Sequence, residues 1–309
     1  MAMPAKLIVN IDHDKTLNKD YTTTIAAGRN KALDPREMLA KMKQQSIFFD
    51  KQGQGIETEQ VIQKYMEAKG VKSISTLVDI ARLGEWALYE EGCMTKNGLI
   101  ELKASLLVGL TKSELDEAAH LAPRTLAPHA LHFTSNLAKA GHAAIIMSDG
   151  WAPVVKGVVD FLALNGVKIE SFCGHTPVFE SGVFTGGLVK VNKWEEAYKI
   201  YDKLGFKQNG SGVYEHAVSI DDSAANLEQM KRHGLAIAYN PTAKDTKAFD
   251  TAGFKNQNFC NVWESEGDRR QIQTDKNFMK TWQDVKNYAL YASNPEKPSS
   301  WFFVNINME

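Results

Sequence analysis

From about residue 126 onward the chain repeats one pattern, in which a helical stretch ends in glycine and is followed by a short apolar run. This alternation is typical of βαβ units, whose strands lie parallel in one sheet between layers of helices. It therefore predicts an α/β fold. The expected strands of this part are 142–148, 167–173, 216–222 and 235–240, and the expected helices are 135–141, 153–166, 194–205 and 225–234.

One further strand is expected at residues 7–11, LIVNI, where no other strand pattern lies nearby. We expect it to join the later sheet, which makes residues 18–125 an insertion. This insertion contains helical patterns, including 58–70, a helix over 73–92 that is interrupted or kinked near Gly84, and a capping box at Thr111 and Glu114. The predicted domains are a discontinuous core (1–17 and 126–250), a helical cap (18–125) and a C-terminal extension packed on the core (251–309), with a last strand at 301–306.

Composition limits the function classes. The chain has 309 residues, 43% of them apolar, and its 36 Lys and Arg residues nearly balance 37 Asp and Glu residues. Such a balance gives no indication of nucleic acid or an anionic membrane as a partner, and favours a small ligand. Three widely spaced cysteines and an N-terminus without an apolar signal segment predict a cytoplasmic protein. Homo-oligomerisation stays open.

Polar residues follow several of the predicted strands directly. Asp12 and Asp14 come after the first strand, Ser148 ends the second, and Asp221 and Asp222 end a later one. Because ligands of parallel sheets gather at the carboxyl ends of the strands, these side chains should meet at one edge. Four carboxylates together require a cation, and oxygen ligands beside a phosphate site favour Mg²⁺.

Each of these features alone has a simpler explanation. An Asp-x-Asp pair after a strand is usually a solvated turn, Ser148 could cap the next helix, and the later aspartates could do the same. Lys193 begins a predicted helix, where the helix dipole disfavours a cation. A neighbouring phosphate would explain that placement, but so would exposure to solvent. The functional interpretation therefore depends on the conjunction of these residues.

The ordered motifs resemble the haloacid dehalogenase superfamily, and more narrowly its phosphoserine phosphatase branch. They are DHDKT at 12–16, SDG at 148–150, Lys193 and DDSAAN at 221–226. The segment LLVGLTKSELDE at 106–117 also resembles the helical cap of that branch. The resemblance covers residues 7–240 and leaves the end of the chain outside.

The resemblance implies a Rossmann-like three-layer core and a Mg²⁺-dependent phosphatase that hydrolyses a small phosphate ester through an aspartyl phosphate. Asp12 would be the nucleophile, and Asp14 would be the general acid and base. The metal would be held by Asp12, by the backbone carbonyl of Asp14 and by Asp222, with Asp221 beside it. The implied substrate and phosphate-binding residues are Thr16, Ser148, Asp149, Gly150, Lys193 and Asn226.

Several positions depart from the family pattern. Asn226 stands where a second aspartate is common, and Asp221 where glycine is usual. His175 replaces an asparagine, Tyr21 replaces the glutamate that holds a substrate amine, and Lys103 replaces an arginine that holds a substrate carboxylate. These changes predict that phosphoserine is a poor substrate. The alternatives are a phosphotransferase with the same intermediate, or a relative that binds metal or phosphate without catalysis.

Overall fold

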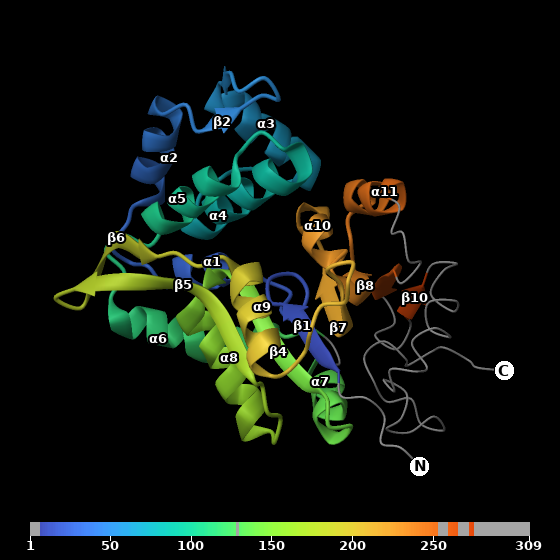
Figure 1. The fold of residues 1–309 in the computed structure, drawn as a ribbon. Coiled ribbons are helices and arrows are strands. Elements are labelled where there is room, and N and C mark those ends of the chain that lie inside the picture. Colours follow the sequence, from blue (N-terminus) through green and yellow to red (C-terminus); the bar gives the residue numbers. More distant parts are fainter. Residues whose placement is uncertain (1–6, 128–129, 253–258, 265–271, 275–309) are drawn as a thin grey trace, which may run out of the picture.

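The computed structural model describes residues 7–127, 130–252, 259–264 and 272–274, and its centre is an eight-stranded sheet (Figure 1). The strand order is β10-β9-β8-β7-β1-β4-β5-β6. The strands are β1 (Ile8–Asp12), β4 (Ala143–Trp151), β5 (Ser171–Glu180), β6 (Val183–Val189), β7 (Tyr214–Asp221), β8 (His233–Tyr239), β9 (Phe259–Glu264) and β10 (Ile272–Thr274).

The first strand lies in the middle of this sheet, which confirms that residues 7–11 join the later strands. Ile8 pairs with Ala143 of β4 on one side and with Ala217 of β7 on the other, both in parallel register. The pairs β4–β5, β7–β8 and β8–β9 are also parallel, whereas β6 and β10 add antiparallel edges. The predicted α/β fold with a parallel sheet is therefore confirmed.

Helices cover both faces of the sheet, so the central strands are buried on both sides. Val9 and Ile11 of β1 belong to the large core that includes α8 (Ala152–Leu164). Ile8 points the other way and packs with Tyr201 of α9 (Lys193–Lys203). Helix α7 (Ala130–Lys139) comes just before β4 in the chain. The short α10 (Leu227–Met230) lies between β7 and β8, and α11 (Ala243–Thr251) follows β8.

The insertion between β1 and β4 is mainly helical. Helices α2 to α5 group at one end of the molecule, whereas α6 lies beside α8 (Figure 1). Whether the insertion and the core are separate domains, divided near residues 17 and 126, stays a prediction. The helices are α1 (Thr22–Ala27), α2 (Pro35–Gln44), α3 (Thr58–Lys69), α4 (Leu77–Trp86), a π-helix (Ala87–Glu91), α5 (Lys96–Ser105), α6 (Lys112–Leu121) and a 3₁₀ turn (Ala122–Thr125), with a small hairpin of β2 (Phe48–Phe49) and β3 (Gly55–Ile56).

Local capping was predicted well, but one glycine was misinterpreted. The capping box of Thr111 and Glu114 forms as expected at the start of α6. Gly84, where an interruption was predicted, lies inside α4, and a Cβ there would approach Leu102 to 2.6 Å. This glycine therefore allows close packing of α4 on α5. The irregularity comes later, where α4 continues as the π-helix.

Three other predictions need correction or lie outside the described residues. The strand expected at 167–173 begins at Ser171 and continues into the β5–β6 hairpin, which was not predicted. The helix expected at 225–234 is only a 3₁₀ turn followed by α10, because β8 already begins at His233. The strand predicted at 301–306 lies outside the described residues.

No described helix is long and apolar enough to cross a lipid bilayer. The cytoplasmic location stays a prediction.

His233, at the start of β8, predicts a pH-dependent stability. Its Nδ1 lies 3.0 Å from the carbonyl oxygen of Gln229, which can only accept, so Nδ1 carries the proton and Nε2 accepts from the Tyr201 hydroxyl at 2.8 Å. Burial lowers the pKa of His233 from 6.5 to about 4. The unfolded chain therefore binds a proton below about pH 6.5 that the folded chain excludes, and stability falls as the pH drops toward 4.

The expected loss over this window is about 3 kcal/mol. Thermal melts between pH 7 and pH 4.5 should show it, and His233→Gln should flatten the slope because its amide can still contact both partners without titrating. An unchanged slope in His233→Gln would assign the acid sensitivity to other groups.

Candidate active site

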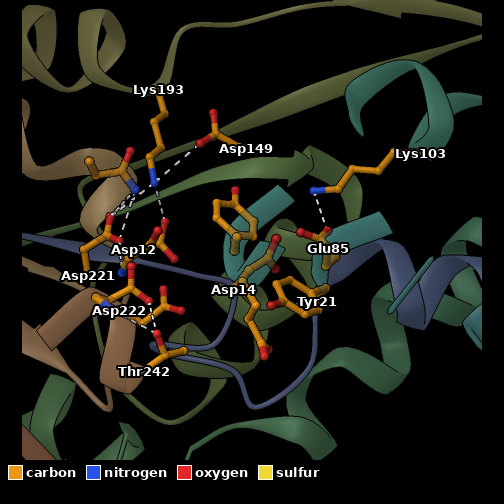
Figure 2. A pocket seen from close by; sticks show the side chains of 15 residues that line it. Asp12, Asp14, Tyr21, Glu85, Lys103, Asp149, Lys193, Asp221, Asp222 and Thr242 are labelled. Carbon is orange, nitrogen blue, oxygen red and sulfur yellow. Dashed lines mark hydrogen bonds and ion pairs between the residues drawn. The ribbon is translucent and has the colours of Figure 1, made fainter. Parts of the chain in front are cut away.

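The carboxyl ends of β1, β4 and β7 lie side by side because β1 pairs with both other strands. The polar residues at these strand ends surround a pocket of about 60 Å³ (Figure 2). The insertion supplies the opposite wall of this pocket, and the loop between β8 and α11 supplies part of its rim. The lining residues are Asp12, Asp14, Tyr21, Glu85, Tyr89, Glu90, Lys103, Asp149, Lys193, Asp221, Asp222, Ser223, Asn226, Thr242 and Asp245.

Lys193 is the cation at the centre of the carboxylates. It is the first residue of α9 and is only 3% exposed. Its Nζ lies 2.6 Å from Asp12 Oδ1, 3.3 Å from Asp221 Oδ2 and 3.6 Å from Asp149 Oδ2. Burial lowers the pKa of Lys193, but these carboxylates outweigh it and raise the pKa well above its usual range. The solvent-exposed alternative for Lys193 is therefore wrong, and a phosphate beside it stays a prediction.

Three carboxylates around this ammonium form a set that could hold a metal ion. Oxygen atoms of Asp12, Asp221 and Asp222 all lie within 4.8 Å of one another. Burial raises the pKa of Asp12 and of Asp222, and the neighbouring carboxylates raise both further against the opposing charge of Lys193. Three carboxylates and one ammonium leave an excess of two negative charges. A divalent cation with oxygen ligands fits both the charge and the donor set.

Asp221 and Asp222 have different surroundings. Asp221 is 1% exposed, and its oxygens accept from Asn226 Nδ2 at 2.9 and 3.1 Å, from the Ser223 amide at 3.0 Å and from Lys193. Asp222 accepts from the Thr16 hydroxyl at 3.4 Å. Because a carboxylate offers about four acceptor sites, Asp221 is nearly saturated by protein donors whereas Asp222 keeps capacity for a ligand.

Asn226 is fixed in turn by a residue that the sequence did not single out. The indole Nε1 of Trp194, the second residue of α9, donates to Asn226 Oδ1 at 3.1 Å. The amide orientation follows, so Asn226 presents its NH₂ group to Asp221. Asn226 thus stabilises a carboxylate as a hydrogen-bond donor, a task that an aspartate at this position could not perform while ionised.

Asp14 is oriented by its own set of neighbours. Its Oδ1 accepts from the Thr22 amide at 2.8 Å and lies 2.9 Å from His13 Nδ1. Asn18 Nδ2 donates to the Ala122 carbonyl and lies 3.3 Å from His13 Nε2, so Nε2 accepts and Nδ1 donates to Asp14. Burial raises the pKa of Asp14, but the hydrogen bonds from His13 and Thr22 and the charge of Lys103 lower it overall.

The residues of the SDG motif, at the end of β4, each make a different kind of contact beside the pocket. Ser148 is fully buried and its Oγ accepts from the Gly150 amide at 2.8 Å. A Cβ on Gly150 would approach the Thr22 hydroxyl to 1.7 Å, so only glycine leaves Thr22 in place beside Asp14. Asp149 pairs with Lys96 at 2.9 Å; burial raises its pKa, but Lys193 and Lys96 lower it overall to about 2.

A buried ion pair lies on the side of the insertion, and the sequence analysis singled out only one of its two residues, Lys103. Lys103 of α5 lies 2.7 Å from Glu85 of α4, and both are almost completely buried. Tyr21 lines the same pocket, as does Tyr89 of the π-helix. Glu85 was missed because it lies within an amphipathic helical pattern, where nothing local distinguishes it from a surface glutamate.

His175, the remaining departure, lies on β5 opposite Trp151 of β4. It is 2% exposed, and its Nδ1 accepts from the Val191 amide at 3.1 Å. Burial lowers its pKa. The structure therefore places His175 in the wall behind the SDG motif as a neutral imidazole.

Fold and site together define the chain as an α/β protein with an acidic pocket at the carboxyl edge of a parallel sheet, walled on one side by an inserted helical segment. No family model and no curated protein matches the sequence.

Two solved structures of phosphoserine phosphatase are similar in fold. One is a phospho-aspartyl intermediate analogue, with 18% identity, a TM-score of 0.50, and coverage of 79% of this chain and 91% of the other. The second is a substrate-bound complex, with 17% identity, a TM-score of 0.51 and coverage of 80% and 91%. The chain therefore has the fold of phosphoserine phosphatase.

Proposed function

We propose that this protein is a Mg²⁺-dependent phosphatase that hydrolyses a small phosphate monoester through an aspartyl phosphate on Asp12. The observation that carries the proposal is the contact of Asp12 with Lys193 inside the carboxylate cluster at the end of β1. The fold shared with phosphoserine phosphatase supports it.

The proposed cycle uses the two aspartates of the first motif. A carboxylate oxygen of Asp12 attacks phosphorus, and the bond from phosphorus to the leaving oxygen breaks. Asp14 gives its proton to that oxygen. Water then attacks the aspartyl phosphate while Asp14 takes a proton from it, which releases phosphate and restores Asp12. The lowered pKa of Asp14 keeps its carboxylate ionised, so that it can accept the proton of the attacking water in the second step. In the first step, the negative charge of the bound phosphate raises the pKa of Asp14 and favours the protonated form that acts as the acid.

Residues in and beside the pocket would hold the phosphoryl group. Lys193 would move its ammonium from carboxylate to phosphoryl oxygens and neutralise charge that develops there. Ser148 and the backbone around Gly150 would bind further oxygens, and Asp149 would keep Lys193 in place. Mg²⁺ would be held by Asp12, Asp222 and the backbone carbonyl of Asp14, and when bound it would offset negative charge on the phosphoryl group.

The direct test is turnover of para-nitrophenyl phosphate by the purified chain. We expect hydrolysis with Mg²⁺, complete loss after chelation, and recovery when Mg²⁺ is restored. Cobalt or manganese can serve as comparison ions, since they share oxygen ligands. Full activity in excess chelator would contradict the metal assignment, and no turnover with any divalent ion would favour a binding protein.

A further inference from the structure

Thr22 contacts both oxygens of the Asp14 carboxyl group. It is the first residue of α1 and is fully buried. Its backbone amide donates to Asp14 Oδ1 at 2.8 Å, and its hydroxyl group donates to Asp14 Oδ2 at 3.3 Å. Asp14 itself lines the pocket, where Figure 2 shows it between Asp12 and Glu85. A single residue of the insertion therefore holds the whole carboxyl group of the proposed acid and base.

The core of the protein sets the direction of the Thr22 hydroxyl. The backbone amide of Trp151, at the end of β4, lies 3.2 Å from Thr22 Oγ1, and an amide N–H can only donate. Because Oγ1 accepts this hydrogen bond, its own proton is free to point to Asp14 Oδ2. Gly150 leaves the room for this arrangement, since a Cβ at that position would lie 1.7 Å from Oγ1. The sheet thus orients a donor that belongs to the insertion.

Protein donors occupy most of the acceptor capacity of Asp14. A carboxylate offers about four acceptor sites, two on each oxygen. Oδ1 accepts from the Thr22 amide and from His13 Nδ1, which lies 2.9 Å away, so both of its sites are used. Among the described residues, Oδ2 accepts from the Thr22 hydroxyl alone. The site that remains for a leaving group or a water molecule is therefore on Oδ2.

We infer that Thr22 is a positioning residue for proton transfer, and that Asp14 Oδ2 is the atom that exchanges the proton. This inference rests on the proposed phosphatase function and adds the residue that orients its acid and base. As the bond from Asp12 to phosphorus forms and the bond from phosphorus to the leaving oxygen breaks, the proton on Oδ2 passes to that oxygen. Water returns a proton to Oδ2 when it attacks the aspartyl phosphate. The Thr22 hydroxyl can donate to Oδ2 throughout, because one site of this oxygen carries the proton and the other accepts from Thr22.

A series of aryl phosphates tests this role in the presence of Mg²⁺. Phenyl, para-nitrophenyl and dinitrophenyl phosphate have similar shapes, but the leaving oxygen needs protonation less and less along the series. Thr22→Val keeps the volume of the side chain and removes the hydroxyl. We expect it to lower kcat/KM for phenyl phosphate by roughly thirtyfold and for dinitrophenyl phosphate by less than about threefold, because only the first depends on the acid. An equal loss for all three esters, or no loss, would overturn the inference.

The second half of the cycle gives an independent measurement. Hydrolysis of the aspartyl phosphate needs Asp14 as a base whatever the leaving group was. With dinitrophenyl phosphate, Thr22→Val should therefore release one burst of dinitrophenol per active site and then turn over roughly tenfold more slowly than wild type. Such a fall in kcat at a nearly constant kcat/KM cannot come from partial unfolding, because the burst counts the active sites. A steady state as fast as that of wild type would contradict the assignment.

Thr23 offers a matched control in the same turn of α1. It is also fully buried, and its hydroxyl has no hydrogen-bond partner among the described residues. Thr23→Val makes the same chemical change without touching Asp14, so it should keep the wild-type ratio of kcat/KM between phenyl and dinitrophenyl phosphate. A shift of this ratio in Thr23→Val as large as in Thr22→Val would assign the effect to packing of the helix and overturn the inference.

Two further variants at Thr22 grade the hydrogen bond. Thr22→Ser keeps the hydroxyl and should retain most of the wild-type ratio. Thr22→Cys has a thiol that donates and accepts only weakly, so its ratio should lie between those of Thr22→Ser and Thr22→Val. This variant also serves as the test if Thr22→Val does not fold, and a wild-type ratio in Thr22→Cys would then overturn the inference. Failure of the wild-type protein to hydrolyse para-nitrophenyl phosphate would instead refute the phosphatase proposal.

Discussion

Replacing Asp12 by asparagine should abolish phosphate-ester hydrolysis, with a fall in kcat of roughly four orders of magnitude or more. The amide of asparagine is isosteric but is not a nucleophile toward phosphorus, so no covalent intermediate can form. Rapid acid quenching with a radiolabelled substrate should show protein-bound phosphate in wild type and none in Asp12→Asn.

Asp202→Asn gives a matched control for this change, since Asp202 lies outside the pocket and forms an exposed ion pair with Lys207 at 3.5 Å. The control should label like wild type, and circular dichroism should show that both variants are folded. Equal labelling of Asp12→Asn and wild type would place the nucleophile elsewhere.

The second large effect concerns the metal. We expect Asp222→Asn to raise the Mg²⁺ concentration for half-maximal activity by roughly a hundredfold, and Asp221→Asn to raise it by about tenfold or less. The reason is that Asp221 already accepts from Asn226, Ser223 and Lys193, whereas Asp222 has acceptor sites left.

The increase in melting temperature on addition of Mg²⁺ gives a measurement that does not depend on turnover. It should be smaller in Asp222→Asn than in Asp221→Asn. The reverse order in both measurements would exchange the roles of the two residues.

Much of this arrangement could be predicted from the sequence because strand ends in a parallel sheet share an edge. That rule brought Asp12, Ser148 and Asp221 together without any knowledge of the intervening chain, and the structure places them so. The capping box of α6 was predictable for a similar reason, since its two residues are three positions apart.

What could not be predicted depends on contacts between distant segments. Glu85 and Lys103 come from different helices, and only the packing of α4 on α5, permitted by Gly84, joins them. Likewise, Trp194 contacts Asn226 because the start of α9 lies beside the 3₁₀ turn that follows β7. The β5–β6 hairpin was missed because its strands contain glycines and exposed polar residues, which do not form a continuous apolar run.

The central position of β1 has a consequence for how the protein folds. This strand precedes the other described strands in the chain, but both of its neighbours in the sheet lie on the far side of the insertion. Pairing of such distant segments must overcome a large loop-closure entropy and is slow. A nascent chain that ends within the insertion carries Asp12 on a strand without neighbours. The proposed phosphatase activity should therefore appear only after β7 has been synthesised and paired with β1.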